Sequence, residues 1–224
     1  MTRIKPNALL AEFIGSAFLC GVVVGSGIMA SDLSGGNIAV TLLGNSIATA
    51  AILWVLVAIL GPISGAHFNP AVTVAFYIDK KIKVSSAVYY IILQVLGCIL
   101  GVWLAHAMFD KAILQVATTA RSGNHFLLSE SIATFALVFA IFGAVRYAPK
   151  SVPAAVALTI LAGYWWTSST SFANPAITIG RALTNTFTGI NPNNLIGFIL
   201  AQLFGAVLAV LVCQFTFSKA QNKT

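Results

Sequence analysis

Long apolar blocks alternate with short polar connections along this chain. Each block approaches the ~20 residues that a membrane-spanning helix needs. The blocks cover roughly residues 8–30, 40–60, 84–108, 126–147, 153–167 and 194–217. The fifth block is the weakest, because its end is polar. The first begins close to Met1 without an A-x-A-like exit, so we expect a retained span rather than a cleaved signal peptide. The pattern predicts an all-α membrane protein with six transmembrane helices.

Two further apolar segments are interrupted by glycine and serine, and read GPISGAHFNPAVTVAF and TSSTSFANPAITIGRA. Both contain the tripeptide Asn-Pro-Ala, formed by Asn69, Pro70 and Ala71 and by Asn174, Pro175 and Ala176. Asparagine is a favoured helix N-cap and proline is favoured at the first helical position, so each tripeptide predicts a helix start. From Pro70 the helical pattern lasts about ten residues, or ~15 Å, which is half of a ~30 Å hydrocarbon core. Two such re-entrant half-helices would together cross the bilayer once.

The chain also repeats itself. LLAEFIGSAF corresponds to LLSESIATFA, which aligns Glu12 with Glu130, and YIILQVLGCILG corresponds to FILAQLFGAVLA, which aligns Gln94 with Gln202. Each half contains three spans, so the second half must enter the membrane from the opposite side. We therefore expect one domain over residues 1–224 that contains an inverted repeat, with halves of about 8–108 and 126–217. Interrupted helices that meet near the midplane in such repeats are known from solute pathways.

Composition supports the membrane setting, because 58% of residues are hydrophobic and 8% are charged, against about a quarter charged in soluble domains. The net charge of +7 suggests a nucleic-acid partner, but its distribution argues against one. Alternating spans place nine basic residues on the cytoplasmic side and three outside. The nine are Arg3, Lys5, Lys80, Lys81, Lys83, Arg146, Lys150, Lys219 and Lys223, and the three are Lys111, Arg121 and Arg181. We expect a plasma (inner) membrane protein with both termini cytoplasmic.

These motifs resemble those of the aquaporin and aquaglyceroporin family, and the resemblance covers essentially the whole chain. It rests on AEFIG with Glu12, on SGAHFNPAVT at 64–73, on FANPAIT at 172–178, and on Gln94, Glu130 and Gln202. The resemblance implies a six-helix bundle with two half-helices, assembled as a homotetramer with one pore per subunit. It also implies a lipid bilayer, water and small neutral solutes as partners, with neither a cofactor nor a metal.

The re-entrant segments supply the candidate chemistry. Non-helical backbone at membrane depth must be buried or line a watery cavity, so Gly61–Phe68 and Ser168–Ala173 are predicted to present carbonyl oxygens along a pore. The Asn69 and Asn174 side chains can cap their half-helices while their amide N–H groups point into the lumen. Both half-helix N-termini also point there, each carrying about half a positive charge. Cations and protons should therefore be disfavoured at the centre.

Three other polar residues lie close to these segments. Glu12 and Glu130 are ionisable groups within spans, which makes a proton relay one interpretation. The resemblance favours another, in which both glutamates accept hydrogen bonds from the re-entrant loops. His67 lies two residues before the first motif asparagine, and either lines the cytoplasmic half of the pore or holds the loop.

The resemblance implies an outer constriction of four residues, one of them an arginine directly after the second motif. This chain has Ile177 in that place. Counting from the two motif asparagines puts the other three positions at Thr49, Ala162 and Ser171. This predicted selectivity filter contains no large ring and no fixed charge, so it should pass solutes larger than water.

Arg181 lies four residues beyond the isoleucine, about one helical turn (~6 Å) outward on the same face. There it could line the outer vestibule and attract polar or anionic solutes. Two alternatives are that it extends to the membrane interface, or that it pairs with Asp110 or Asp32.

An aliphatic residue in place of the arginine resembles a bacterial subgroup associated with arsenic-resistance gene clusters. That subgroup is taken to conduct trivalent metalloid hydroxides such as arsenous acid, and methylated arsenicals. We therefore expect a passive channel for such arsenicals, for glycerol, or for both, together with water. A water-selective channel, a coupled secondary transporter and a non-conducting membrane scaffold are the alternatives. We expect no enzyme, because the sequence has no nucleophile and base pair, metal spacing or phosphate loop.

Overall fold

The computed structural model describes residues 5–217, and within this range it contains eight α-helices and two short 3-10 helices. Their bounds are α1 Pro6–Leu33, α2 Ile38–Ser64, α3 Pro70–Ile78, α4 Val84–Met108, α5 Asn124–Tyr147, η1 Pro149–Ser151, α6 Val152–Trp166, α7 Pro175–Arg181, η2 Pro192–Asn194 and α8 Leu195–Thr216. Arg3, Lys219 and Lys223, which we expected on the cytoplasmic side, lie outside the described residues.

Five of the described helices, α1, α2, α4, α5 and α8, are long and apolar enough to cross a membrane. The sixth span is α6, which has 15 residues and continues directly from η1. Its shortness agrees with the weak fifth block of the sequence. The six-span prediction is confirmed.

The spans form two tightly packed pairs, α1 with α4 and α5 with α8, and α2 packs against both α1 and α6. Glycines permit the close approach within each pair. A Cβ added to Gly97 of α4 would lie 2.4 Å from the backbone oxygen of Phe13, and one added to Gly205 of α8 would lie 2.1 Å from that of Ser131. Since Cβ atoms do not approach an oxygen so closely, both crossings need glycine. These contacts occupy equivalent positions in the two halves of the sequence.

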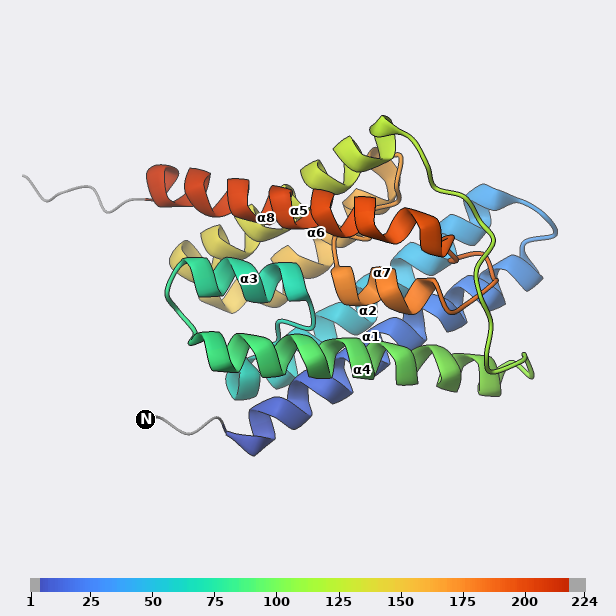
Figure 1. Cartoon of the computed structure of the whole chain (residues 1–224), viewed down its shortest axis with the longest axis horizontal. Coiled ribbons are helices and arrows are strands. Elements are labelled where there is room, and N and C mark those ends of the chain that lie inside the picture. Colours follow the sequence, from blue (N-terminus) through green and yellow to red (C-terminus); the bar gives the residue numbers. More distant parts are fainter. Residues whose placement is uncertain (1–4, 218–224) are drawn as a thin grey trace, which may run out of the picture.

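The half-helices α3 and α7 lie in line with their N-terminal ends facing each other (Figure 1). Both pack between α4 and α8. α3 has nine residues and α7 has seven, so each spans only part of the bilayer thickness. This confirms two re-entrant half-helices. The boundaries that we expect for the two repeats, about 8–108 and 126–217, stay a prediction.

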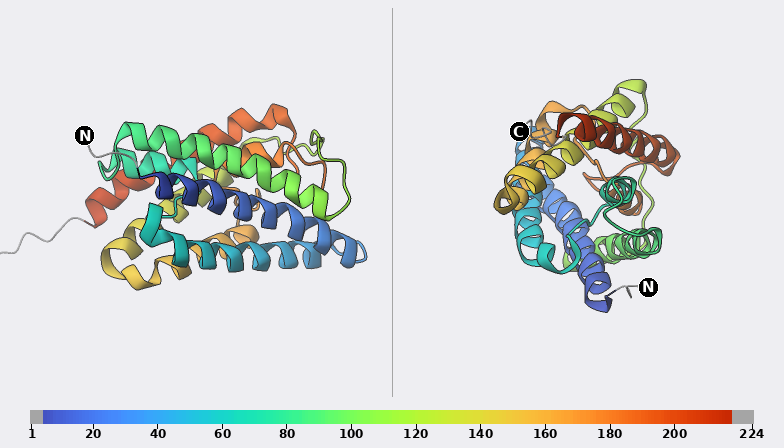
Figure 2. Two further views of the ribbon diagram at one scale, coloured as in Figure 1. Left: turned by 90° about the horizontal axis from the view of Figure 1, so that it is seen from below. Right: turned by 90° about the vertical axis from the view of Figure 1, so that its left-hand side faces the viewer.

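The connections gather at the two ends of the bundle (Figures 1 and 2). The segments 79–83 and 148–151 lie at one end, together with the start of α1 and the end of α8. These two segments contain Lys80, Lys81, Lys83 and Lys150. The long connection 109–123 lies at the opposite end, so the basic residues are concentrated at the end where we expect the cytoplasm.

One predicted boundary is wrong. We expected non-helical backbone from Gly61, but α2 continues through Pro62 and ends at Ser64. The cap is Gly65, whose φ of 93° is left-handed and whose N–H donates to the carbonyl of Gly61 at 2.9 Å. Pro62 removes a single helical hydrogen bond, and the helix ends where a glycine permits the left-handed turn.

Candidate solute pore

The two Asn-Pro-Ala motifs build matching helix starts. Asn69 Oδ1 accepts from the N–H of Ala71 at 2.9 Å, and Asn174 Oδ1 accepts from the N–H groups of Ala176 and Ile177 at 2.9 and 3.3 Å. Proline follows each asparagine at the first helical position. The local sequence therefore sets where α3 and α7 begin, as expected for this N-cap chemistry.

The same asparagines connect the two halves of the chain. Asn69 Nδ2 donates to the carbonyl of Ala173 at 2.7 Å, and Asn174 Nδ2 donates to the carbonyl of Phe68 at 2.9 Å. An amide has two N–H donors, so each asparagine keeps a second donor besides the one that crosses between the repeats. Both side chains line the central cavity, where this donor can meet a solute.

Glu12 holds the first re-entrant loop. Its Oε1 accepts from Ser64 Oγ at 2.6 Å and from the N–H of His67 at 3.0 Å. Its Oε2 accepts from the N–H of Phe68 and from Gln94 Nε2, both at 2.8 Å. The carboxylate is fully buried, so these four donors take the place of the water molecules that would hydrate it at the surface.

Glu130 holds the second loop in the same way. Its two oxygens accept from the N–H groups of Phe172 and Ala173, each at 2.9 Å, and Oε2 also accepts from Gln202 Nε2 at 2.6 Å. Gln202 in turn donates to Thr178 Oγ1 at 2.8 Å. Both glutamates thus make the loop contacts that the resemblance implies.

The loops need this support because their backbone adopts costly conformations. Ala66 and Phe68 in the first loop have φ values of 50° and 47°, and Thr170, Ser171 and Ala173 in the second have 63°, 50° and 46°. Left-handed backbone at residues other than glycine costs of order 1–3 kcal/mol each. Hydrogen bonds from adjacent N–H groups to the buried carboxylates hold these conformations. Phe68 and Ala173, both left-handed, are the residues whose carbonyls accept the bonds between the two halves.

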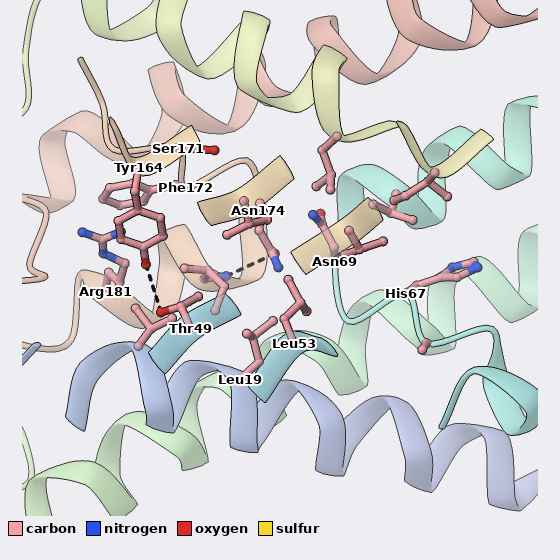
Figure 3. A pocket seen from close by; sticks show the side chains of 18 residues that line it. Leu19, Thr49, Leu53, His67, Asn69, Tyr164, Ser171, Phe172, Asn174 and Arg181 are labelled. Carbon is pink, nitrogen blue, oxygen red and sulfur yellow. Dashed lines mark hydrogen bonds between the residues drawn. The ribbon is translucent and has the colours of Figure 1, made fainter. Parts of the chain in front are cut away.

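A narrow cavity of about 60 Å³ runs through the region where the loops meet (Figure 3). Its walls contain the side chains of Leu19, Val23, Thr49, Leu53, Ala66, His67, Asn69, Val72, Leu137, Ile141, Val156, Ile160, Tyr164, Ser171, Phe172, Asn174, Ile177 and Arg181. Most of the wall is aliphatic, and a few donors and acceptors interrupt it. Figure 3 places the asparagine pair centrally, with Tyr164, Phe172 and Arg181 on one side and His67 on the other.

The structure corrects one of the four predicted filter positions. Thr49, Ser171 and Ile177 line the cavity, whereas Ala162 is exposed on the outer surface of α6. Tyr164 faces the cavity instead, and its hydroxyl lies 3.2 Å from Thr49 Oγ1. Counting back from the motif fails because it assumes a fixed length for the connection that follows α6. The expectation of no large ring at this level was therefore wrong.

The structure places Arg181 in the wall of the same cavity, and its vestibule role stays a prediction. Its side chain is 2% exposed and lines the cavity, and its guanidinium carbon lies 3.3 Å from the centre of the Phe172 ring. Its Nε donates to the carbonyl of Thr188. Within residues 5–217 it makes no ion pair, so the expected alternatives of Asp110 or Asp32 as a partner are wrong.

A second guanidinium approaches the same ring. Arg121, in the connection before α5, lies 5.1 Å from the Phe172 ring centre, and its Nε donates to the carbonyl of Gly189 at 3.0 Å. Burial lowers the pKa of Arg121 from its ordinary value, although a guanidinium remains charged in proteins. Neither Phe172 nor Tyr164 was among the predicted site residues. The available signal was that both are aromatic residues within ten positions before the second motif.

His67 both lines the cavity and holds its loop. Its Nδ1 lies 3.1 Å from Thr73 Oγ1, and its ring stacks on Phe76 with centroids 4.7 Å apart. The two alternatives left open by the sequence are therefore compatible. Among the described residues no group of histidine, cysteine and acidic side chains could hold a metal ion.

The comparisons agree with this geometry. Residues 4–164 match the protein family described as "Major intrinsic protein". The chain is 47% identical over 212 residues to aquaglyceroporin AqpS of Rhizobium meliloti (strain 1021), covering 95% of this chain and 91% of that protein. It is 33% identical over 227 residues to aquaporin-4 of Mus musculus, covering 94% and 67%. The fold resembles the X-ray structure of the aquaglyceroporin from Plasmodium falciparum, with a TM-score of 0.77 at 15% identity over 95% and 96% of the two chains. This membrane protein belongs to the major intrinsic protein family.

Proposed function

We propose that this protein is a passive, electroneutral channel for small uncharged solutes, with trivalent metalloid hydroxides and glycerol as its preferred solutes besides water. The main observation behind the proposal is the set of side chains that line the cavity. Donors of Asn69 and Asn174 lie at its centre, and hydroxyls of Thr49, Tyr164 and Ser171 lie beside an aliphatic Ile177. A small molecule with several hydroxyls can exchange its water partners for these groups. Arsenous acid is neutral at physiological pH and is such a molecule.

Two arguments support passive conduction rather than coupled transport. Glu12 and Glu130 are the buried acidic residues of the described spans, and their oxygens already accept hydrogen bonds from the loops. The facing N-terminal ends of α3 and α7 place positive partial charge at the centre, which disfavours a coupling cation. The relative named aquaglyceroporin AqpS supports polyol-sized solutes. By family resemblance we propose a homotetramer in the inner membrane, with cytoplasmic termini.

A water-selective channel is the second candidate, and a specific observation favours it. The cavity holds only about 60 Å³, and the Tyr164 ring and the Arg181 guanidinium narrow it at the outer end. We infer that solute passage then depends on Ile177, which lines the same cavity. Ile177 has a shorter, uncharged side chain where an arginine would add both bulk and donors.

The test is the ratio of solute to water permeability in proteoliposomes with Ile177→Arg. We expect arsenite and glycerol fluxes to fall more than water flux, because the longer side chain narrows the constriction and adds fixed donors beside Ser171. Ile177→Val is the matched control and should keep the wild-type ratio. An unchanged ratio in normally incorporated Ile177→Arg would show that selectivity is set elsewhere, and the metalloid proposal would lose its support. Solute flux that stopped when a proton gradient was dissipated would contradict the passive channel.

A further inference from the structure

Arg181 is a cation in the cavity wall that has no ion-pair partner among residues 5–217. It is 2% exposed, lines the same cavity as the two motif asparagines, and forms no ion pair with any described acidic residue. A buried charge is normally paired, because removing it from water is costly. Here a ring face and a backbone carbonyl replace the missing carboxylate. A guanidinium without a carboxylate bonded to it keeps its net positive charge beside the lumen.

The side chain is also fixed in place. The Phe172 ring lies under the guanidinium, 3.3 Å from its carbon to the ring centre, and the carbonyl of Thr188 accepts from Nε. The ring is itself held, because the N–H of Phe172 donates to Glu130 and the ring packs edge-on against Phe198 at 5.2 Å between centroids. Both oxygens of Glu130, a nearby acid, accept hydrogen bonds from loop N–H groups.

We propose that Arg181 determines charge selectivity at the outer end of this pore, and that Phe172 is the positioning residue that holds its guanidinium against the wall. A cation entering the cavity would pass close to this fixed charge. Two unit charges about 6 Å apart at an effective dielectric of about 20 repel each other enough to reduce passage on the order of a hundredfold. A neutral solute meets no such barrier and gains hydrogen-bond donors. The proposal rests on the proposed channel function and adds the residue that excludes ions.

Arg181→Gln tests the proposal in proteoliposomes loaded with a pH-sensitive or sodium-sensitive dye. We expect proton or sodium leak to rise about tenfold or more, a larger factor than the change in glycerol or water flux, because the variant removes the charge while Gln keeps a polar side chain in the cavity wall. Arg121→Gln is the matched control. It removes the other guanidinium that lies over the Phe172 ring, and Arg121 is not among the residues that line the cavity. It should leave ion exclusion unchanged. Arg181→Lys should retain most of the exclusion, because it keeps the charge.

A rescue separates charge from structure. The double variant Ile177→Arg with Arg181→Gln returns a guanidinium to the same helix face one turn inward, and should restore ion exclusion. Phe172→Leu should raise the leak by less than Arg181→Gln does, because the charge remains but is less fixed. If Arg181→Gln fails to assemble, Arg181→Met keeps an unbranched stem against the ring and provides the same test. Ion exclusion equal to wild type in an assembled Arg181→Gln or Arg181→Met channel would overturn the proposal. If the wild-type protein conducted no glycerol or water, that result would instead contradict the proposed channel function.

Discussion

Replacing Glu12 with glutamine turns one carboxylate oxygen into an NH₂ group at nearly constant volume. The Ser64 hydroxyl can rotate to accept from this new donor, and the Gln94 amide can flip, because its Oε1 is buried without a partner. The backbone N–H groups of His67 and Phe68 cannot change roles. They donate to different oxygens of Glu12, at 3.0 and 2.8 Å. Whichever way the new amide is placed, one of them therefore faces another donor.

The free-energy cost follows from the number of hydrogen bonds that the substitution removes. One hydrogen bond to a charged group is lost in a buried site, which costs about 1.5–3 kcal/mol. For a chain of this length each kcal/mol lowers the melting temperature by roughly 2–4 °C, so the expected decrease is roughly 5–10 °C. The left-handed backbone at Ala66 and Phe68 loses part of its support at the same time. Neutral-solute flux should fall because the loop, which holds His67 and Asn69 in the cavity wall, is less firmly held in its native conformation.

The assay combines thermal unfolding of the detergent-solubilised protein with glycerol flux in proteoliposomes, with and without a proton gradient. Glu130→Gln is the matched comparison and should lower the melting temperature similarly, since Phe172 and Ala173 donate to different oxygens of Glu130. An unchanged melting temperature would refute the hydrogen-bond argument. If Glu12→Gln kept its stability but lost a flux that depends on the proton gradient, the carboxylate would be a coupling group and the protein a transporter.

Three further predictions concern the pore and the packing. Asn174→Asp should impair conduction or assembly, because a carboxylate cannot donate to the carbonyl of Phe68 as the amide does at 2.9 Å; wild-type glycerol and water fluxes would show that this donor is dispensable. Tyr164→Ala should raise the ratio of glycerol to water permeability by removing the ring at the constriction, and a lower ratio would contradict the assignment of this position. Gly101→Ala places a Cβ 2.2 Å from a backbone oxygen of α1 and should destabilise the protein by about 1–3 kcal/mol. Gly61→Ala, with open space around it, is its control in thermal unfolding.

The sequence predicted the half-helix starts correctly because the information is local. Asn69 with Pro70, and Asn174 with Pro175, contain both the cap and the first helical residue, and the structure begins α3 and α7 there. The six spans follow from block length and hydrophobicity. The family resemblance implied the contacts of Glu12 and Glu130 with the loops, and the repeat makes the two sets of contacts equivalent.

The errors concern positions that depend on distant parts of the chain. Tyr164 was missed because the pore-facing residue of α6 depends on how many residues connect it to α7. The surroundings of Arg181 were missed because its partners, the Thr188 carbonyl and the Phe172 ring, come from a loop conformation without helical periodicity. The end of α2 was misplaced because the expected non-helical segment began at Gly61, whereas the helix ends at Ser64, before the left-handed Gly65.

The exchanged hydrogen bonds between the two motifs have a consequence for biosynthesis. The Asn69 amide needs the carbonyl of Ala173, and the carbonyl of Phe68 needs the Asn174 amide, so neither re-entrant loop can complete its bonds before both are in the membrane. During synthesis the first loop must therefore wait, with these polar groups unpaired, until more than a hundred later residues have been added. The last step of folding should be the joining of two preformed halves. A chain cut within 109–123 should accordingly regain conduction only when both fragments are made in the same membrane.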